Sequence, residues 1–112
     1  MMGRRTSIEA FKRDNELVDI IFNHKGKGNA IGTKELVSLL NERGYTVKPD
    51  QVHSIVGHIV ANRHIPICSV TNCGYYWATS QQDIQSAIDD LQEKANGLQE
   101  RIDFLKSFIY ER

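Results

Sequence analysis

Apolar residues recur at helical spacing in the first part of the chain, and glycines interrupt them. Asp14 or Asn15 can cap a first helix, whose apolar residues at positions 17–22 would form its buried side and which must end near Gly26. A short extended piece at 30–32 leads to a second helix from Thr33 to Gly44, with its apolar residues at 36, 37, 39 and 40 at helical spacing. Residues 1–13, ahead of both helices, are polar and basic and predict an N-terminal arm or a lead-in turn to the first helix.

A third helix is predicted from Pro49 to about Arg63. Proline is tolerated in the first turn of a helix, and Asp50 suits the positive end of the helix dipole. Apolar residues at 52, 55, 56, 59 and 60 form one inward stripe, so the opposite face is polar and weakly charged. The residues on or beside this outward face are Gln51, His53, Ser54, Gly57, His58, Ala61 and Asn62.

Two short segments rich in β-branched and aromatic residues follow, at 65–70 and 75–79. Because turn-forming residues at 71–74 join them, they predict a β-hairpin. Tyr75, Tyr76 and Trp77 could stack on nucleic-acid bases, but alternating aromatic residues on such a strand more often close a core. We therefore expect these three rings to belong to the core.

The predicted order is helix, short strand, helix, turn, helix and hairpin. Residues 32–79 resemble the small winged helix-turn-helix proteins of bacteria and their phages. The segments that carry the resemblance are Glu35-Leu36, Asn62-Arg63 at the end of the third helix, Ile65-Pro66-Ile67-Cys68-Ser69, and Gly74-Tyr75-Tyr76-Trp77-Ala78-Thr79. The resemblance implies a mainly α fold with a small β-hairpin, a winged domain over 14–79 and a role in duplex DNA binding.

Ser80 is a predicted N-cap, with Asp83 three residues later. Beyond Ser80, apolar residues alternate at intervals of four and three, which is the pattern of a coiled-coil seam. A helix over 80–112 would be about 45 Å long, and one small domain cannot cover a whole face of that length. We therefore expect the helix to mediate dimerisation or to bind a partner; the alternative is a helix packed on its own domain. The seam residues are Ile84, Ile88, Leu91, Ala95, Leu98, Ile102, Leu105 and Ile109.

The charges beside this seam disfavour a parallel homodimer. In that arrangement Arg101 would face Lys106, and Lys94 would face Gln99, without an acidic partner. An antiparallel homodimer, a folded-back helix or another protein with an acidic helix avoids the clash. We favour the antiparallel homodimer, because two winged domains can then bind two DNA half-sites.

DNA contacts are expected from the third helix and the segments around it. Glutamine and asparagine can pair bidentately with adenine, whereas lysine and arginine bind phosphates. The expected contacts are Gln51, His53, Ser54, His58 and Asn62 on the third helix, Lys48 and Arg63 at its ends, Lys34 on the second helix, and Arg4 and Arg5 in the arm. The alternative is a solvated helix face that binds nothing.

Charge is unevenly distributed along the 112 residues, although the formal net charge is zero. Residues 1–64 hold ten lysines and arginines against seven acidic residues, and residues 65–112 hold four against seven. This balance favours modest, salt-dependent DNA affinity. The chain has neither an apolar run of roughly 20 residues nor an apolar signal segment, so a cytoplasmic location without membrane insertion is expected.

Other chemistry finds little support in the sequence. His64, Cys68 and Cys73 could bind zinc, but their spacing lacks a Cys-x-x-Cys knuckle, and Cys68 is expected to be a small buried residue. Gly26-Lys27-Gly28 lacks the spacing of a phosphate loop and is expected to be a turn. No nucleophile, base and orienting group occur at a recognisable spacing. We expect no enzyme, metal or cofactor.

Two functions follow from these patterns. The first is a DNA-binding protein, acting as a transcriptional regulator or as an accessory factor in phage or plasmid replication. The second is a winged-helix interaction module that binds another protein through the wing and the C-terminal helix. The low basic charge on the third helix favours the second function, and the helix-turn-helix order with its basic arm favours the first.

Overall fold

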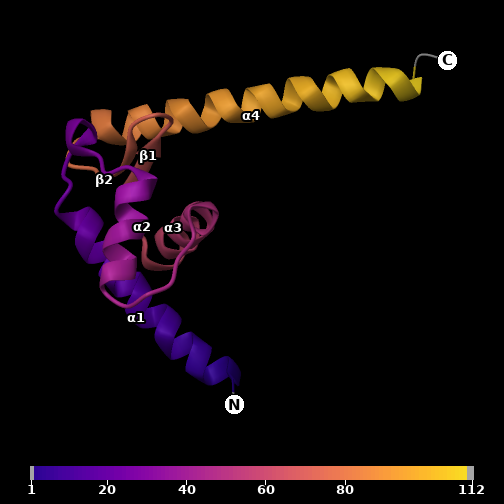
Figure 1. Cartoon of the computed structure of the whole chain (residues 1–112). Coiled ribbons are helices and arrows are strands. Elements are labelled where there is room, and N and C mark those ends of the chain that lie inside the picture. The colour runs from indigo at the N-terminus through magenta and orange to yellow at the C-terminus, as the bar shows by residue number, and fades with distance from the viewer. Residues whose placement is uncertain (1, 111–112) are drawn as a thin grey trace.

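The computed structural model describes the backbone of residues 2–110 and the side chains of residues 8–109. The chain is mainly helical, with one antiparallel hairpin and a long C-terminal helix that extends away from the rest (Figure 1). This coarse architecture was predicted from the sequence. The elements are α1 (Met2–Phe22), the short 3-10 helix η1 (Lys27–Asn29), α2 (Thr33–Glu42), α3 (Pro49–Arg63), β1 (Ile67–Val70), β2 (Gly74–Trp77) and α4 (Gln81–Tyr110).

The first helix is longer than the sequence pattern predicted. It begins at Met2, so the predicted cap at Asp14 or Asn15 is wrong, and residues 2–13 continue α1 instead of forming a separate arm. The end of α3 contacts this part of α1: the Arg63 guanidinium donates a 2.8 Å hydrogen bond to the Asn15 side chain and lies 5.4 Å from the centre of the Phe11 ring. The side chains of Arg4 and Arg5 lie outside the described residues.

The core lies where α1, α2 and α3 meet the hairpin. The inward stripes predicted for the second and third helices are buried or half-buried, as is that of the first helix apart from Phe22, which is 44% exposed. Phe22 instead packs edge-on against the half-buried Trp77, with ring centres 4.9 Å apart. The most deeply buried side chains are Leu17, Ile21, Ile31, Leu36, Leu40, Val52, Ile59 and Tyr76.

In the hairpin β1 pairs with β2, and the short extended piece before α2 lies beside β2. Ile31 and Tyr75 exchange two backbone hydrogen bonds, each 2.8 Å long, so Ile31 lies beside β2 as a single-residue bridge. Tyr75 and Tyr76 are buried, which confirms that these two rings belong to the core. The hairpin is thereby fixed to the start of α2 as well as to the helical core.

The start of α4 is held against the hairpin by polar contacts around Asp83. The Ser80 hydroxyl accepts a 3.1 Å hydrogen bond from the Asp83 amide, which confirms the predicted N-cap. The Asp83 carboxylate accepts hydrogen bonds from the amides of Thr79 and Lys27, at 3.0 and 3.3 Å, and these bonds lower the pKa of Asp83. The Tyr76 hydroxyl donates a 2.7 Å hydrogen bond to the Asp83 carbonyl. The first turn of α4 therefore has a fixed direction.

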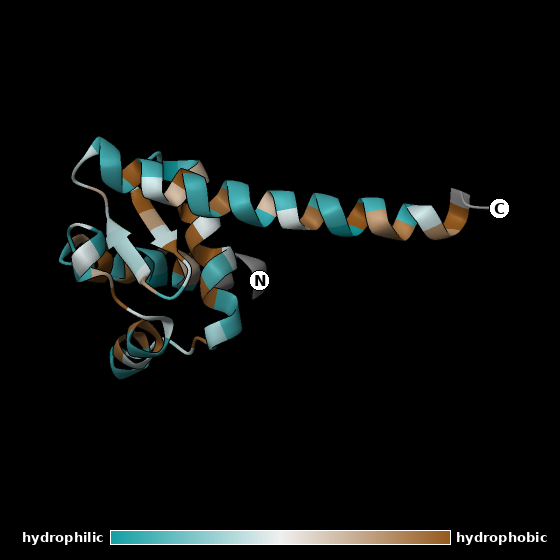
Figure 2. Cartoon of the chain, turned by 90° about the horizontal axis from the view of Figure 1, so that it is seen from above, coloured by the Kyte–Doolittle hydropathy of each residue, from teal (hydrophilic) through white to brown (hydrophobic). Residues whose placement is uncertain are grey.

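Most of α4 extends beyond the body of the protein. Ala87 is buried, but every described residue from Leu91 to Ile109 is exposed except the half-buried Ser107. Figure 2 shows hydrophobic positions recurring along the helix out to its C-terminal end. The alternative in which α4 packs on its own domain is therefore wrong for the part of the helix from Leu91 to Ile109. Among the described residues, no helix is long and apolar enough to span a membrane.

Candidate nucleic-acid interface

The outward face of α3 is open to solvent, as the sequence pattern predicted. Gln51, His53, Ser54, His58 and Asn62 are all exposed, as are Lys34 near the N-terminus of α2 and Lys48 just before α3. Gly57 and Ala61 are also exposed on α3, so small and polar residues alternate on this face. The helix thus presents a continuous surface that an external partner can reach.

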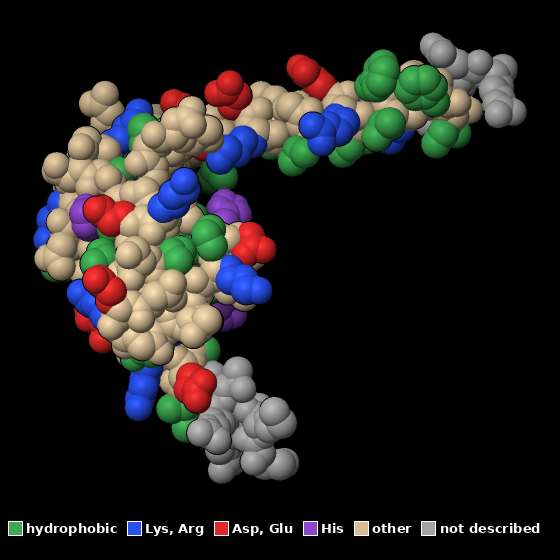
Figure 3. All heavy atoms as spheres, in the orientation of Figure 1, with side chains coloured by type: hydrophobic (Ala, Val, Ile, Leu, Met, Phe, Trp, Pro, Cys, Tyr) green, Lys and Arg blue, Asp and Glu red, His purple; other side chains and the backbone are tan. Residues whose placement is uncertain are grey.

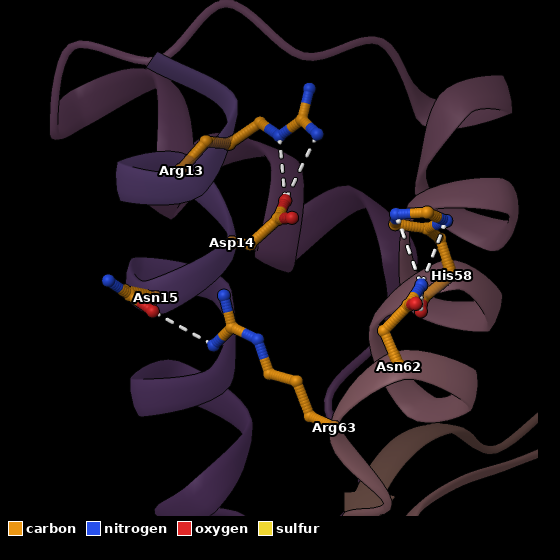
Figure 4. A network of polar contacts seen from close by, with 6 residues as sticks. All are labelled: Arg13, Asp14, Asn15, His58, Asn62 and Arg63. Carbon is orange, nitrogen blue, oxygen red and sulfur yellow. Dashed lines mark hydrogen bonds and ion pairs between the residues drawn. The ribbon is translucent and has the colours of Figure 1, made fainter. Parts of the chain in front are cut away.

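Two of the polar side chains on α3 already make hydrogen bonds within the helix. The Gln51 side-chain oxygen accepts a 2.9 Å bond from the Lys48 amide and satisfies a free N–H at the start of the helix. The Asn62 side-chain nitrogen donates a 2.8 Å bond to the His58 carbonyl and lies 3.2 Å from both ring nitrogens of His58 (Figure 4). Ser54 and His53 are the polar residues of this face for which the structure records no such bond.

Arg63 is separated from the other predicted DNA contacts. Its guanidinium points to α1, where it binds Asn15, while His58 and Asn62 lie on another side of α3 (Figure 4). In the same region Arg13 donates two hydrogen bonds, of 3.0 and 3.1 Å, to the Asp14 carboxylate. Arg63 therefore links α3 to α1, and Arg13 carries a partly neutralised charge.

An open concavity of about 640 Å³ lies where α2, α3 and the hairpin converge. Its lining includes Lys34 from the first turn of α2, His53 from α3, and Thr71 in the hairpin turn. No side chain of the described residues caps the N-terminus of α2, so the backbone N–H groups of its first turn are available to an anion. The concavity combines a helix N-terminus, a lysine and the edge of α3.

Lys94 of α4 also lines this concavity, a position that the sequence analysis did not single out. Its ammonium lies 3.0 Å from the Asp90 carboxylate, which also accepts a 3.2 Å hydrogen bond from the Thr71 hydroxyl. The hydrogen bond from Lys94 is the main cause that lowers the pKa of Asp90. No local motif signals this contact, because it depends on how α4 crosses the hairpin.

The two cysteines do not face each other. Cys68 lies opposite Tyr76 in the register of the hairpin, whereas Cys73 belongs to the turn, and both are free thiols. Cys68 is half-buried rather than fully buried, and this burial raises the pKa of its thiol. Among the described residues, no three His, Cys, Asp or Glu side chains come close enough together to hold a metal ion.

Comparison of the chain with protein-family models, curated proteins and solved structures found no match. Two surfaces of the described residues are open to a partner: the concavity with the adjoining face of α3, and the apolar side of α4. The first combines uncapped backbone N–H groups with lysine side chains, and the second consists of exposed apolar side chains.

Proposed function

We propose that this protein binds duplex DNA as a winged helix-turn-helix protein. The observation that carries the proposal is the concavity at which the N-terminus of α2, the outward face of α3 and the hairpin turn converge. In DNA-binding proteins of this class, the second helix contacts the backbone and the third helix enters the major groove. The Ile31–Tyr75 bridge supports the same class, because it ties the hairpin to the start of α2.

Each part of this surface has a distinct proposed role. The free amides at the start of α2 and the Lys34 ammonium bind phosphate, which positions the protein without reading sequence. Ser54 and His58 contact base edges, because they lie on the exposed face of α3. Gln51 and Asn62 contribute only the polar atoms that their bonds within the helix leave free.

The low charge of the surface determines the kind of binding proposed. Asp90 partly neutralises Lys94, and Arg63 is turned toward α1, so few cations remain to bind phosphates. The nonspecific affinity for DNA is therefore modest and disappears with added salt. This suits a transcriptional regulator or a replication accessory factor, whose selectivity comes from base contacts.

Charge removal at Lys34 tests the proposed phosphate contact. In a titration of a labelled duplex, Lys34→Ala is expected to weaken binding similarly for all sequences and to reduce the salt slope by about one. Ser54→Glu is expected to weaken binding more than tenfold, since it adds an anion to the face that approaches the bases. Fluorescence anisotropy over a salt series measures both effects.

The matched control is Arg43→Ala at the other end of α2. Arg43 pairs with Glu16 of α1 at 2.6 Å, away from the concavity, so its removal is expected to leave the salt slope unchanged. If Lys34→Ala and Arg43→Ala had the same effect, DNA would not be contacted at the N-terminus of α2. Circular dichroism of all three variants checks that they remain folded.

A second candidate function is a protein-interaction module, in which the wing and α4 bind another protein. The observation in its favour is the large apolar surface that α4 exposes (Figure 3). Absence of DNA binding even at low salt, together with a stable complex between the wing or α4 and another protein, would favour this function over the first.

A further inference from the structure

An apolar groove runs between α3 and the first half of α4, on the side of α3 that adjoins the concavity. Its volume is about 430 Å³. Gly57 and Ala61 line its α3 side, and Ile84, Ile88 and Leu91 line its α4 side. The three residues from α4 are 42%, 49% and 55% exposed, although they are large and apolar. Exposed apolar surface of this extent is typical of a contact site.

The α3 side of the groove is unusually open to close approach. A Cβ atom added at Gly57 would meet no other atom within 4 Å, so no contact within this chain requires a glycine there. Glycine in the middle of a helix is also less stable than alanine. Together with Ala61, one turn later, Gly57 leaves room for another helix to lie close to α3.

The distal half of α4 carries the apolar side chains that such a groove could receive. Leu98, Ile102 and Leu105 of the seam are 57%, 46% and 56% exposed. Phe104 and Phe108, whose rings pack edge-on with centres 5.1 Å apart, are 63% and 64% exposed. Figure 3 shows these hydrophobic side chains gathered over the distal half of the helix.

The spacing of the seam makes the helix complementary to itself in an antiparallel orientation. In one register every seam residue meets another seam residue, and none is left without a partner. The small Ala95 lies beside the large Leu98 near the centre, so the thinnest part of one helix meets a bulky residue of the other. The layers of this register are Ile84 with Ile109, Ile88 with Leu105, Leu91 with Ile102, and Ala95 with Leu98.

The two phenylalanines lie on the correct side of the helix for this register. Ala87 is buried against the body and directly precedes the seam residue Ile88. Near the C-terminal end of α4, Phe108 occupies the same heptad position, directly before the seam residue Ile109. In antiparallel pairs these equivalent positions of the two helices share one side. Phe108, with Phe104 one turn before it, therefore comes to lie at the groove of the other copy. A parallel pair would leave both rings far from either groove.

The charge distribution along α4 also favours the antiparallel pair. Residues 81–96 hold four acidic residues and one lysine, whereas residues 97–110 hold two acidic and two basic residues. A parallel pair aligns the two acidic halves, but an antiparallel pair places each acidic half against a neutral one. In the register above, Lys94 of one copy faces Arg101 of the other, and Asp90, which pairs with Lys94 at 3.0 Å, lies beside both cations. Lys106 of one copy lies near Asp89 of the other.

From these observations we infer that the occupant of the groove is a second copy of this chain, whose last turns of α4, with Phe104 and Phe108, seat against Gly57 and Ala61. The resulting homodimer has two symmetric grooves, each filled by the other copy. The bodies lie on one side of the helix pair and are separated by about 30 Å along it, close to the roughly 34 Å between DNA half-sites. The inference does not depend on DNA binding.

Disulfide trapping in the full chain tests this seating. The background carries Cys68→Ala and Cys73→Ser, to which Ala61→Cys and Phe108→Cys are added. Within one chain, Phe108 lies about 25 Å along α4 from Leu91 at the edge of the groove, so a link between positions 61 and 108 can form only between two copies. The expected result is a covalent dimer on mild oxidation and a dimer mass for the unmodified protein in light scattering.

Two matched controls define the orientation. Ala61→Cys with Ser107→Cys is expected to give no covalent dimer, because position 107 is on the side of the helix opposite the seam. Leu105→Cys alone is also expected to give none, since a parallel pair would bring position 105 of both copies together. Linkage through Leu105→Cys without linkage between positions 61 and 108 would overturn the inference.

A monomer mass at every concentration tested would overturn it as well. DNA binding is measured separately on the same wild-type protein, so loss of the dimer and loss of DNA binding are independent outcomes. The altered residues Ala61 and Phe108 are both exposed in the isolated chain, so their replacement is not expected to prevent folding.

Discussion

Replacing Gly74 with alanine is expected to destabilise the protein by about 3 kcal/mol. Gly74 opens β2 with a φ of +106°, in a region that side chains rarely adopt. A Cβ atom at this position would also overlap the carbonyl of Ile31. That carbonyl accepts the Tyr75 amide hydrogen bond, so the substitution must separate the extended piece before α2 from the hairpin. Chemical denaturation monitored by circular dichroism measures the loss.

Gly28→Ala is the matched control for this substitution. An added Cβ at Gly28 meets no atom within 4 Å, and its backbone does not require glycine. Alanine there is expected to be neutral or to stabilise the protein by less than about 1 kcal/mol. Equal destabilisation by both substitutions would show that the hairpin is not tied to the start of α2 as described.

Leu40→Ala is expected to cost about 3 kcal/mol of unfolding free energy, because it leaves a cavity in the core. Leu40 is completely buried on α2, among the residues that join α1, α2 and α3. Thermal or denaturant unfolding measures the difference from the wild-type protein. A loss of this size is a large fraction of the stability of a domain this small.

The neighbouring Leu39→Ala provides the control for helix propensity, since it makes the same change in the same helix. Leu39 is only half-buried, so we expect a loss of about 1 kcal/mol. If Leu39→Ala were as costly as Leu40→Ala, the face that α2 turns to the core would be different from the one described here.

Local sequence patterns predicted the elements whose signals are strong and short-range. Pro49 marks the first residue of α3, Ser80 caps α4, and the aromatic residues 75–77 lie in β2, although the strand begins at Gly74, which was predicted in the turn. In each case neighbouring residues determine both the backbone conformation and the buried face, so no knowledge of distant contacts is needed. The unbroken heptad spacing likewise predicted a helix that the body cannot cover.

Contacts between distant segments explain what the sequence patterns missed. Helix α1 extends back to Met2. Arg63, at the end of α3, contacts Phe11 and Asn15 of this helix. The spacing of Ile8, Phe11 and Val18 is compatible with one helix face and offered a local signal for this extension. The same contact withdraws Arg63 from the predicted DNA contacts. Lys94 reaches the concavity only because α4 packs across the hairpin, which no local pattern reveals.

The two proposed interfaces lie side by side on the outward face of α3. Gly57 and Ala61 face the groove in which the second copy is seated, whereas Ser54 and His58 do not line it. His53 lines both the groove and the concavity, and therefore lies at the boundary between them.

Titration of the wild-type protein onto a labelled duplex across a salt series tests the central claim most directly. With Lys34 and Lys48 as the cationic phosphate contacts, we expect binding at low salt that weakens with a log–log slope of about −2. Enrichment of a short sequence motif among retained genomic fragments is expected alongside it. No binding at the lowest salt concentration, or binding that does not change with salt, would contradict the account.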